Sequence, residues 1–407
     1  MTTLFDTPVA VIQGARQVGK STLVSLVAEK INCMKITLDD TTMLNAAKTD
    51  PLAFVNQYPG GTLAIDEVQL CPELLRAVKL SVDENRRPGR FLLTGSADLL
   101  HVAGANESLA GRAETIKLYP FSQGEMEGRK EDFISSILRA NLAGLLDTLQ
   151  GAPALTREDY AARVAMGGYP DIVLKDSKRR NAWFRNYIMS VLDHDAADLS
   201  GLSHLDKLGV LFSVISGQTS SEFVQRSVAG MTGIPESSLS GYVRLLKDLY
   251  LVLELSAWGR NLSRRVVSKK KISLTDSGVA SHLNGLSETA LADVLRGEAF
   301  GAVLESFVVA ELFKQQSWSA EDFTLYHYRD RDRKEVDLVV ELFDGRIVAL
   351  EVKAARTVSR SDFAGMKTLR ETAGDRFLCG IVLYTGANAL PYGNDMFAAP
   401  ISAVWGS

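Results

Sequence analysis

The stretch Gly14-Ala15-Arg16-Gln17-Val18-Gly19-Lys20-Ser21 determines how the first part of this chain folds. The apolar run 8–12 precedes it, and the largely apolar run 22–27 follows it. This order predicts a strand, a glycine-bounded loop and a helix, which is the context of a phosphate-binding loop. Backbone N–H groups in such a loop face a triphosphate at the positive end of the helix. We therefore expect ATP to contact Gly14, Ala15, Arg16, Gln17, Val18, Gly19, Lys20, Ser21 and Thr22.

The residue types in and after this loop predict ATP hydrolysis with Mg²⁺. Lys20 would reach the β- and γ-phosphates, and the hydroxyl of Ser21 would ligate Mg²⁺. The apolar run 61–68 predicts a buried strand, and it carries the pair Asp66-Glu67 near its end. At such a strand end Asp66 would hold Mg²⁺, mostly through water, and Glu67 would polarise the attacking water.

Three further residues are candidates for the nucleotide site, and two of them have an alternative interpretation. Thr94 and Ser96 lie at the end of another predicted strand, 90–96, and either hydroxyl could sense the γ-phosphate. Ser96 could equally be a simple helix cap. Arg112 could act as an arginine finger on the nucleotide of a neighbouring copy, which would require a homo-oligomer, or it could form a surface ion pair.

Composition restricts the class of protein. The 407 residues are 46% hydrophobic and 23% charged, so we expect two or three soluble globular domains. The net charge of −4 excludes a uniformly basic nucleic-acid binder, so that any DNA contact must come from a local patch. The odd, scattered cysteines and the absence of an apolar run of about 18 residues predict a cytoplasmic protein without a membrane partner.

A second acidic constellation lies near the C-terminus. Predicted strands 335–342 and 346–353 carry Asp337 and the sequence Glu351-Val352-Lys353. Asp337 and Glu351 could hold Mg²⁺, Lys353 could stabilise an attacking hydroxide, and Glu305 on a preceding helix is a candidate third carboxylate. The alternatives are a solvated hairpin with an ordinary Glu–Lys pair and a Glu305 that only caps or bridges.

The turn between these strands provides a geometric test of that site. A two-residue turn at Asp344-Gly345 would pair Asp337 with Val352 and direct the aspartate away from Glu351. We predict instead a three-residue loop, with Gly345 left-handed, that pairs Asp337 with Lys353.

The middle of the chain predicts helices at 131–150, 157–166 and 179–199. Three more helices and a strand pair follow, and three helices before a strand pair are the order of a winged-helix module. The second part of that module would place Tyr242 and Arg244 on a recognition helix with three serines. A basic cluster follows it and could grip DNA phosphates, or be a solvated loop or pair with acidic groups: Arg260, Arg264, Arg265, Lys269, Lys270 and Lys271.

The motifs together resemble one family, the prokaryotic AAA-type ATPases whose C-terminal half is a domain of unknown function. The resemblance rests on the phosphate loop, on Ile65-Asp66-Glu67-Val68-Gln69, on Leu109-Ala110-Gly111-Arg112, and on motifs at 166–170, 274–278 and 304–312. The chain departs from the family pattern in starting almost at the first strand, in having Ala15 where proline is usual, and in having His194-Asp195 for Arg-Asp. The pattern around Asp337 and Glu351 resembles the PD-(D/E)XK nucleases.

The expected fold class is α/β. We expect a P-loop ATPase domain at 1–125, a helical lid-like region at 126–200, a winged-helix-like region at 201–285 and a restriction-endonuclease-like domain at 286–407. The leading hypothesis is an ATPase that couples nucleotide state to DNA binding or processing. The alternative is a nucleotide-gated regulatory protein with a catalytically silent nuclease-like domain.

Overall fold

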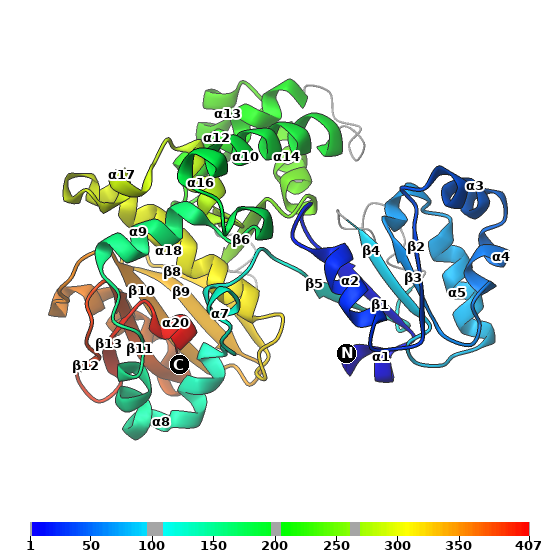
Figure 1. The fold of residues 1–407 in the computed structure, drawn as a ribbon. Helices are drawn as coiled ribbons and strands as arrows, with labels where there is room; N and C mark the ends of the chain where they lie inside the picture. Colours follow the sequence, from blue (N-terminus) through cyan, green and yellow to red (C-terminus); the bar gives the residue numbers. More distant parts are fainter. Residues whose placement is uncertain (1, 96–108, 197–204, 261–268, 407) are drawn as a thin grey trace. The chain divides into compact units, whose positions relative to one another are not determined.

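The computed structural model describes residues 2–95, 109–196, 205–260 and 269–406 (Figure 1). The chain divides into two compact units, the first made essentially of residues 1–119 and the second of most of the remainder. Among the described residues, no helix is long and apolar enough to cross a membrane.

The first unit is built on a five-stranded parallel sheet in the order β2-β3-β4-β1-β5. Its central strands are buried along their whole length because helices cover both faces. The strands are β1 (Val9–Gln13), β2 (Cys33–Thr37), β3 (Thr62–Asp66), β4 (Phe91–Gly95) and β5 (Ala113–Lys117). In this order β4 lies between β1 and β3, so the loops after these three strands lie at one edge.

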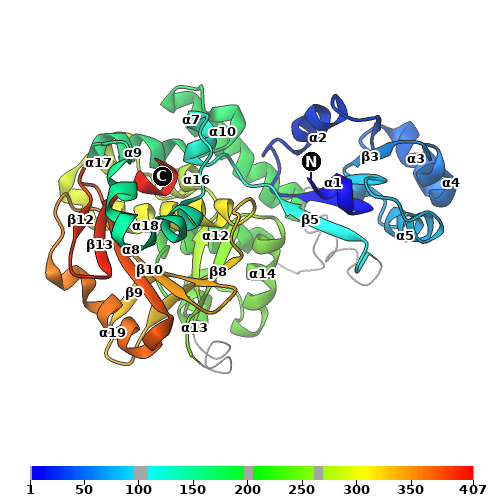
Figure 2. The ribbon, with the colours of Figure 1, turned by 90° about the horizontal axis from the view of Figure 1, so that it is seen from below.

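Two groups of helices flank this sheet (Figure 2). One face packs against α3 (Thr41–Thr49), α4 (Pro51–Asn56) and α5 (Leu74–Glu84) through residues such as Phe54 and Val78. The other face packs against α1 (Thr2–Asp6) and α2 (Lys20–Ala28) through Leu4 and Val24. A short helix, α1, therefore precedes β1, although the sequence analysis expected the chain to begin almost at the first strand.

The second unit contains an eight-stranded mixed sheet in the order β12-β13-β11-β10-β9-β8-β6-β7. Its strands are β6 (Val252–Ala257), β7 (Lys271–Leu274), β8 (Phe323–Arg329), β9 (Glu335–Leu342), β10 (Ile347–Lys353), β11 (Phe377–Tyr384), β12 (Leu390–Pro391) and β13 (Met396–Pro400). Strand β6 pairs antiparallel with β7 and parallel with β8. The sheet therefore runs across the predicted boundary at residue 285.

Helices make up the rest of the second unit. Those before β6 are α7 (Gln123–Glu127), α8 (Phe133–Gln150), α9 (Arg157–Met166), α10 (Ser177–Ser190), α12 (Leu208–Gly217), α13 (Gln225–Thr232) and α14 (Glu236–Asp248). Those after β7 are α16 (Ser277–Leu283), α17 (Glu288–Ala292), α18 (Gly297–Gln315), α19 (Ala364–Ala373) and α20 (Ala403–Gly406). Helix α19 packs on the sheet through Met366 and Leu369, while α18 is buried along most of its length.

Most predicted elements are present with shifted ends. The stretch 288–314, predicted as one helix, is broken into α17, a short 3-10 turn and α18, because Asp293 caps a new turn through the N–H of Leu295. Helix α10 begins at Ser177 and ends at Ser190, where a π-helical turn, Val191–Asp195, takes over. Tyr242 of α14 is buried, so it is not an exposed residue of a recognition helix.

A buried acid in the second unit predicts a pH-dependent stability. Glu131 is 5% exposed and accepts a hydrogen bond from the N–H of Gly124 at 3.1 Å. Burial and the nearby charge of Glu311 raise its pKa to about 7, and Lys314 opposes this only in part. Because the folded state binds the proton of Glu131 more tightly than the unfolded chain does, this proton stabilises the fold. The stabilisation is complete at pH values below the pKa of Glu131 in the unfolded chain, and it is lost as the pH rises through about 7.

Glu131→Gln is therefore expected to be about 1–3 kcal/mol more stable than the wild type at pH 8.5, with no gain at pH 4.5. Urea denaturation at the two pH values measures this difference. Substituting the exposed Glu158 by Gln is the control and should change stability by less than about 1 kcal/mol at either pH. An equal effect of Glu131→Gln at both pH values would contradict the proposed role of its charge.

Candidate functional sites

The phosphate-binding loop lies where the sequence places it, between β1 and α2. Gly19 is left-handed, with φ 96°, and a Cβ on Gly14 would lie 2.0 Å from the backbone oxygen of Leu118. Gly14 is thus required by the close approach of the chain after β5. The ammonium of Lys20 is buried against the loop, at 3.0 Å from the oxygen of Gly14 and 2.9 Å from that of Ala15.

The sheet order brings the predicted acidic pair and Thr94 together. Thr94 at the end of β4 is fully buried, and its hydroxyl donates to Asp66 Oδ1 at the end of β3. The same hydroxyl accepts from the N–H of Glu67 at 3.3 Å. This bonding favours Thr94 as the hydroxyl that responds to the nucleotide. Ser96, the other candidate, lies outside the described residues.

Glu67 is held in an unusual backbone conformation beside the loop. Its φ is 57°, in the left-handed region, and its carboxylate accepts a hydrogen bond from Gln69. Burial raises its pKa, while Gln69 and the charge of Lys20 act in the opposite direction. The carboxylate is therefore more basic than an exposed one, which suits a group that polarises water. The sequence analysis quoted Gln69 only as part of a motif and missed its bond to Glu67, although it lies two residues after that glutamate.

These residues fit a magnesium nucleotide. The hydroxyl of Ser21 is exposed in the first turn of α2, a helix of nine residues whose N-terminus carries positive partial charge. Asp66 supplies a carboxylate, and Mg²⁺ prefers such oxygen ligands together with phosphate oxygens and water. Ser21 and Asp66 are thus the residues that would hold the metal.

Arg112 lies at the opposite edge of the sheet from the phosphate loop. It precedes β5, whose first residue pairs with the first residue of β1, whereas the loop follows the last residue of β1. Its guanidinium forms a two-bonded ion pair with Asp83, at 2.6 and 2.9 Å. Arg112 is therefore far from the nucleotide site of its own chain, and only the action on a neighbouring copy stays open as a catalytic role.

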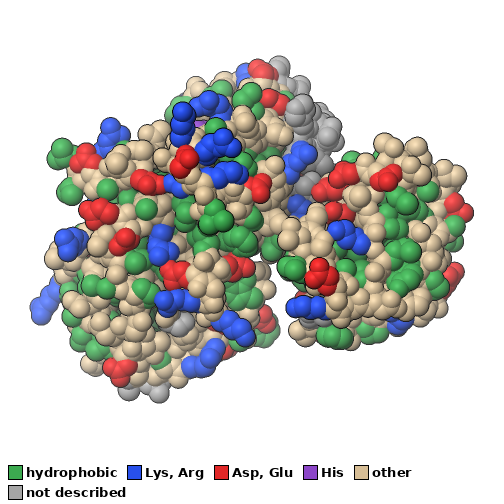
Figure 3. Space-filling view, in the orientation of Figure 1, with side chains coloured by type: hydrophobic (Ala, Val, Ile, Leu, Met, Phe, Trp, Pro, Cys, Tyr) green, Lys and Arg blue, Asp and Glu red, His purple; other side chains and the backbone are tan. Residues whose placement is uncertain are grey.

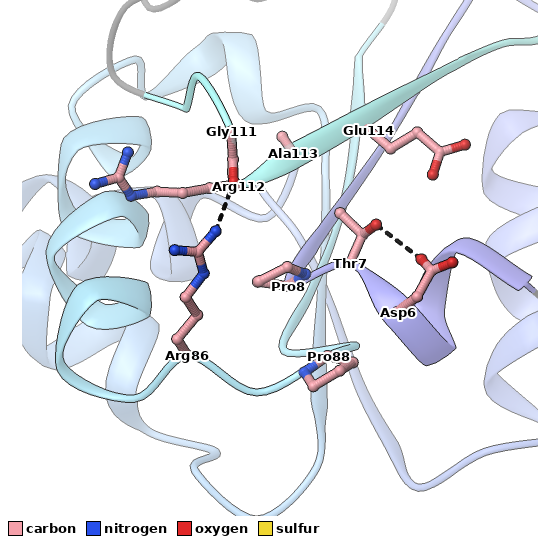
Figure 4. A pocket seen from close by; sticks show the side chains of 9 residues that line it. All are labelled: Asp6, Thr7, Pro8, Arg86, Pro88, Gly111, Arg112, Ala113 and Glu114. Carbon is pink, nitrogen blue, oxygen red and sulfur yellow. Dashed lines mark hydrogen bonds between the residues drawn. The ribbon is translucent and has the colours of Figure 1, made fainter.

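Arg112 also lines a pocket of about 360 Å³ at this edge (Figure 4). The pocket is formed by residues before β1, β4 and β5 and by the first residues of β5, and in it Arg86 donates to the backbone oxygen of Gly111 at 2.9 Å. Because it lies at the amino ends of the parallel strands, this pocket is not the nucleotide site.

The predicted residues of the C-terminal site are also brought together. Glu305 comes from α18, Asp337 from β9, and Glu351 and Lys353 from β10. Glu351 Oε2 accepts from the N–H of Asp337 at 3.3 Å, and Lys353 donates to Glu351 Oε1 at 2.7 Å. In turn, Asp337 Oδ2 accepts from the N–H of Val352 at 2.8 Å.

The register of β9 and β10 corrects one prediction. The loop has three residues and Gly345 is left-handed, with φ 84°, as expected. However, the loop comprises Phe343, Asp344 and Gly345, and this sets the register of the two strands. The last pair of the ladder is Leu338 with Leu350, so Asp337 lies beside Glu351 and not beside Lys353. Phe343 stays out of the ladder and is 93% exposed.

A β-bulge in β9 gives Asp337 its direction. Tyr326 of β8 pairs with Val339, and Tyr328 pairs with Val336. Between these two pairs β9 therefore has one residue more than β8. The extra residue falls at Asp337 or Leu338. Bulges of this kind redirect side chains next to functional sites.

Lys271 is the residue of this site that sequence reasoning misplaced. The DNA-binding interpretation of the basic cluster is wrong for Lys271, which is 1% exposed and pairs with acidic groups, as the alternative interpretation expected. Its ammonium lies 2.9 Å from Glu305 Oε1, 2.8 Å from Glu335 Oε1 and 3.8 Å from Asp337 Oδ1. Burial alone would lower the pKa of Lys271, but the carboxylates more than offset it and raise that pKa.

The carboxylates themselves carry raised pKa values. Burial raises the pKa of Glu305 to about 8, and the charge of Asp337 adds to this. Burial and Asp337 likewise raise the pKa of Glu351 to about 8. Among the described residues, no group of three or more His, Cys, Asp or Glu side chains is arranged to hold a metal ion. In the described arrangement the ammonium of Lys271 faces these carboxylates.

The other residues of the basic cluster are partly paired. Lys270 forms an ion pair with Glu254 at 2.6 Å, and Lys269 lies 3.6 Å from Glu222. Arg260 is exposed, and Arg264 and Arg265 lie outside the described residues. A second basic surface, which the sequence analysis did not single out, lies over α10, where Lys178, Arg179 and Arg185 are exposed (Figure 3).

Comparisons with known proteins match three segments of the chain to family models. Residues 6–127 match a family described as AAA domain. Residues 157–290 and 300–404 match two families described as domains of unknown function, DUF8612 and DUF4143. The first part of the chain is an AAA-type P-loop ATPase domain. Nucleotide binding and hydrolysis are the activities that this domain supports.

The relatives found are themselves uncharacterized. Uncharacterized proteins of Mycobacterium bovis and Mycobacterium tuberculosis are each 26% identical over 403 residues, covering 98% of this chain and 82% of theirs. A solved Walker-type ATPase of Pyrococcus abyssi is 16% identical, with a TM-score of 0.42, covering 70% of this chain and 93% of that chain.

Proposed function

We propose that this protein hydrolyses Mg²⁺-ATP and couples its nucleotide state to DNA binding or processing through a nuclease-like C-terminal domain. The observation that carries the ATPase part is the convergence at one sheet edge of Lys20, the Asp66–Thr94 pair and Glu67. The parallel order β2-β3-β4-β1-β5 produces this convergence.

The chemistry assigned to the chain's own residues follows from their contacts. Lys20 would exchange the carbonyl oxygens of Gly14 and Ala15 for the β- and γ-phosphates when ATP binds. Glu67 would orient and polarise the attacking water, and Thr94 would link the state of the γ-phosphate to Asp66 and the backbone of Glu67. Mg²⁺ held by Ser21 and Asp66 would neutralise charge on the phosphates.

DNA is the partner that the exposed basic residues of α10 and Arg260 favour, since lysine and arginine bind phosphates without sequence preference. The second candidate function, a nucleotide-gated regulatory protein whose nuclease-like domain is silent, is favoured by the ammonium of Lys271 within the carboxylate cluster. In that case the DNA, or another partner, would be bound without cleavage.

ATP hydrolysis by the wild type and by Lys20→Ala, with and without branched DNA, tests the proposal. Removing the ammonium should lower turnover at least about 100-fold, because it removes the charge that stabilises the transferred phosphoryl group. DNA should stimulate the wild type, and a gel shows whether cleavage accompanies it.

Lys30→Ala removes an exposed lysine from the same unit and should leave turnover unchanged. Turnover that persists in Lys20→Ala would contradict the assignment of the site. Turnover that vanishes in Lys20→Ala but ignores every DNA would favour the regulatory function.

A further inference from the structure

The carboxylate cluster of the second unit already contains a cation supplied by the chain. Lys271 enters it from β7, whereas Glu305 comes from α18 and Glu335 and Asp337 come from β9. The ammonium lies within 2.8–3.8 Å of all three carboxylates. It is almost fully buried, so water does not compete for these contacts.

The backbone of Lys271 is fixed on both sides. It pairs with Leu255 of β6 and forms a bridge to Glu222. The neighbouring Lys270 accepts a hydrogen bond from the N–H of Phe223 at 2.7 Å, through its backbone oxygen. Moving the ammonium out of the cluster would therefore require β7 to leave its place in the sheet.

The oxygens that a metal would need are turned toward protein donors. Glu305 Oε1 and Glu335 Oε1 accept from Lys271, and Asp337 Oδ2 accepts from the N–H of Val352. Both oxygens of Glu351 are engaged, one by Lys353 and one by the N–H of Asp337. Mg²⁺ requires near-octahedral oxygen ligands at about 2.0–2.1 Å, and it would have to approach a buried positive charge to obtain them.

We propose that the ammonium of Lys271 takes the place of a divalent cation between Glu305, Glu335 and Asp337, so that this cluster joins β7 to α18 and β9 and does not bind metal. The cluster then has no route to metal-dependent cleavage of a phosphodiester. This inference deepens the second candidate function but does not depend on ATP hydrolysis.

Mn²⁺ binding to the full, nucleotide-free chain tests the proposal. Wild type and Asp337→Asn should bind the same number of Mn²⁺ ions, because the cluster around Asp337 holds none in the wild type. Calorimetry or Mn²⁺ spin resonance measures this number. A wild-type site that disappears in Asp337→Asn would overturn the proposal. Without nucleotide, the phosphate loop lacks the phosphate oxygens that complete its metal site, so the two sites are distinguished.

Removing the internal cation should create a metal site. Lys271→Ala is expected to be less stable than wild type, to gain one Mn²⁺ site, and to rise in Tm by about 5 °C with saturating Mn²⁺. Adding Asp337→Asn should abolish the gain. A folded Lys271→Ala protein that gains no site would overturn the proposal.

Lys353→Ala is the matched control. It removes the other lysine of the cluster, one whose side chain is 35% exposed, and leaves Lys271 in place. It should therefore gain no Mn²⁺ site. If Lys271→Ala fails to fold, the comparison of wild type with Asp337→Asn still decides the question.

Discussion

Replacing Glu67 by Gln is expected to lower the rate of ATP hydrolysis by about 10²–10³-fold while leaving ATP binding intact. The amide has nearly the same size and can still accept the hydrogen bond from Gln69, but it has no charge with which to polarise water. The loss should fall on kcat, because Glu67 would act on the water and not on the nucleotide. Steady-state hydrolysis and binding of a fluorescent ATP analogue measure the two quantities separately.

Glu84→Gln provides the matched control for this variant. Glu84 is exposed at the end of α5 in the same unit, so its substitution removes the same charge from elsewhere on the surface. It should leave both binding and hydrolysis unchanged. Unaltered hydrolysis in Glu67→Gln would assign the polarising role to another group, and loss of ATP binding would indicate that Glu67 supports the loop instead.

Gly365→Ala is expected to lower the free energy of unfolding of the second unit by about 3 kcal/mol or more. A Cβ at this position would lie 1.8 Å from the backbone oxygen of Glu335 and 2.7 Å from its carbonyl carbon. Helix α19 would have to move away from β9, and it would disturb the strand two residues before Asp337. Backbone atoms on both sides of the contact leave no side chain that can rotate away.

The measurement can be confined to the unit concerned. All four tryptophans of the chain, Trp183, Trp258, Trp318 and Trp405, belong to the second unit, so their fluorescence during urea denaturation reports its unfolding. Gly301→Ala in α18 is the control, because nothing lies within 4 Å of its Cβ position. It should stabilise by up to about 1 kcal/mol through helix propensity. Equal stability of the two variants would contradict the close contact of α19 with β9.

The nucleotide site could be predicted from the sequence because its information is local. A glycine-bounded loop between an apolar strand and a helix, and an acidic pair at the end of another apolar strand, each specify their own backbone. The carboxyl ends of parallel strands lie at one edge of a sheet, so the strand order then brings these residues together. What the sequence did not provide was the hydrogen bond of Thr94 to Asp66 and the ion pair of Arg112 with Asp83, which depend on contacts between distant parts of the chain.

The C-terminal cluster was predicted only in part, because Glu305, Asp337, Glu351 and Lys353 were identified but Lys271 and Glu335 were not. Alternation along β9 and β10 was enough to identify Asp337, Glu351 and Lys353 as partners. Their register depended on whether Phe343 or Arg346 joined the loop, and a bulge then redirected Asp337. Lys271 was misplaced because two preceding lysines suggested a solvated run, while its burial depends on β6 pairing with β8, about 70 residues later in the chain.

The pairing of β6 with β8 also limits how this protein can evolve. One recognisable domain ends at residue 290 and the next begins at residue 300, yet strands from both form a single sheet. A gene fusion or deletion at that seam would expose the edge of β8 in one fragment and remove the counter-charges of Lys271 from the other. The two modules are therefore expected to be inherited together, and a shuffled partner would need both a matching strand edge and a lysine at the same position.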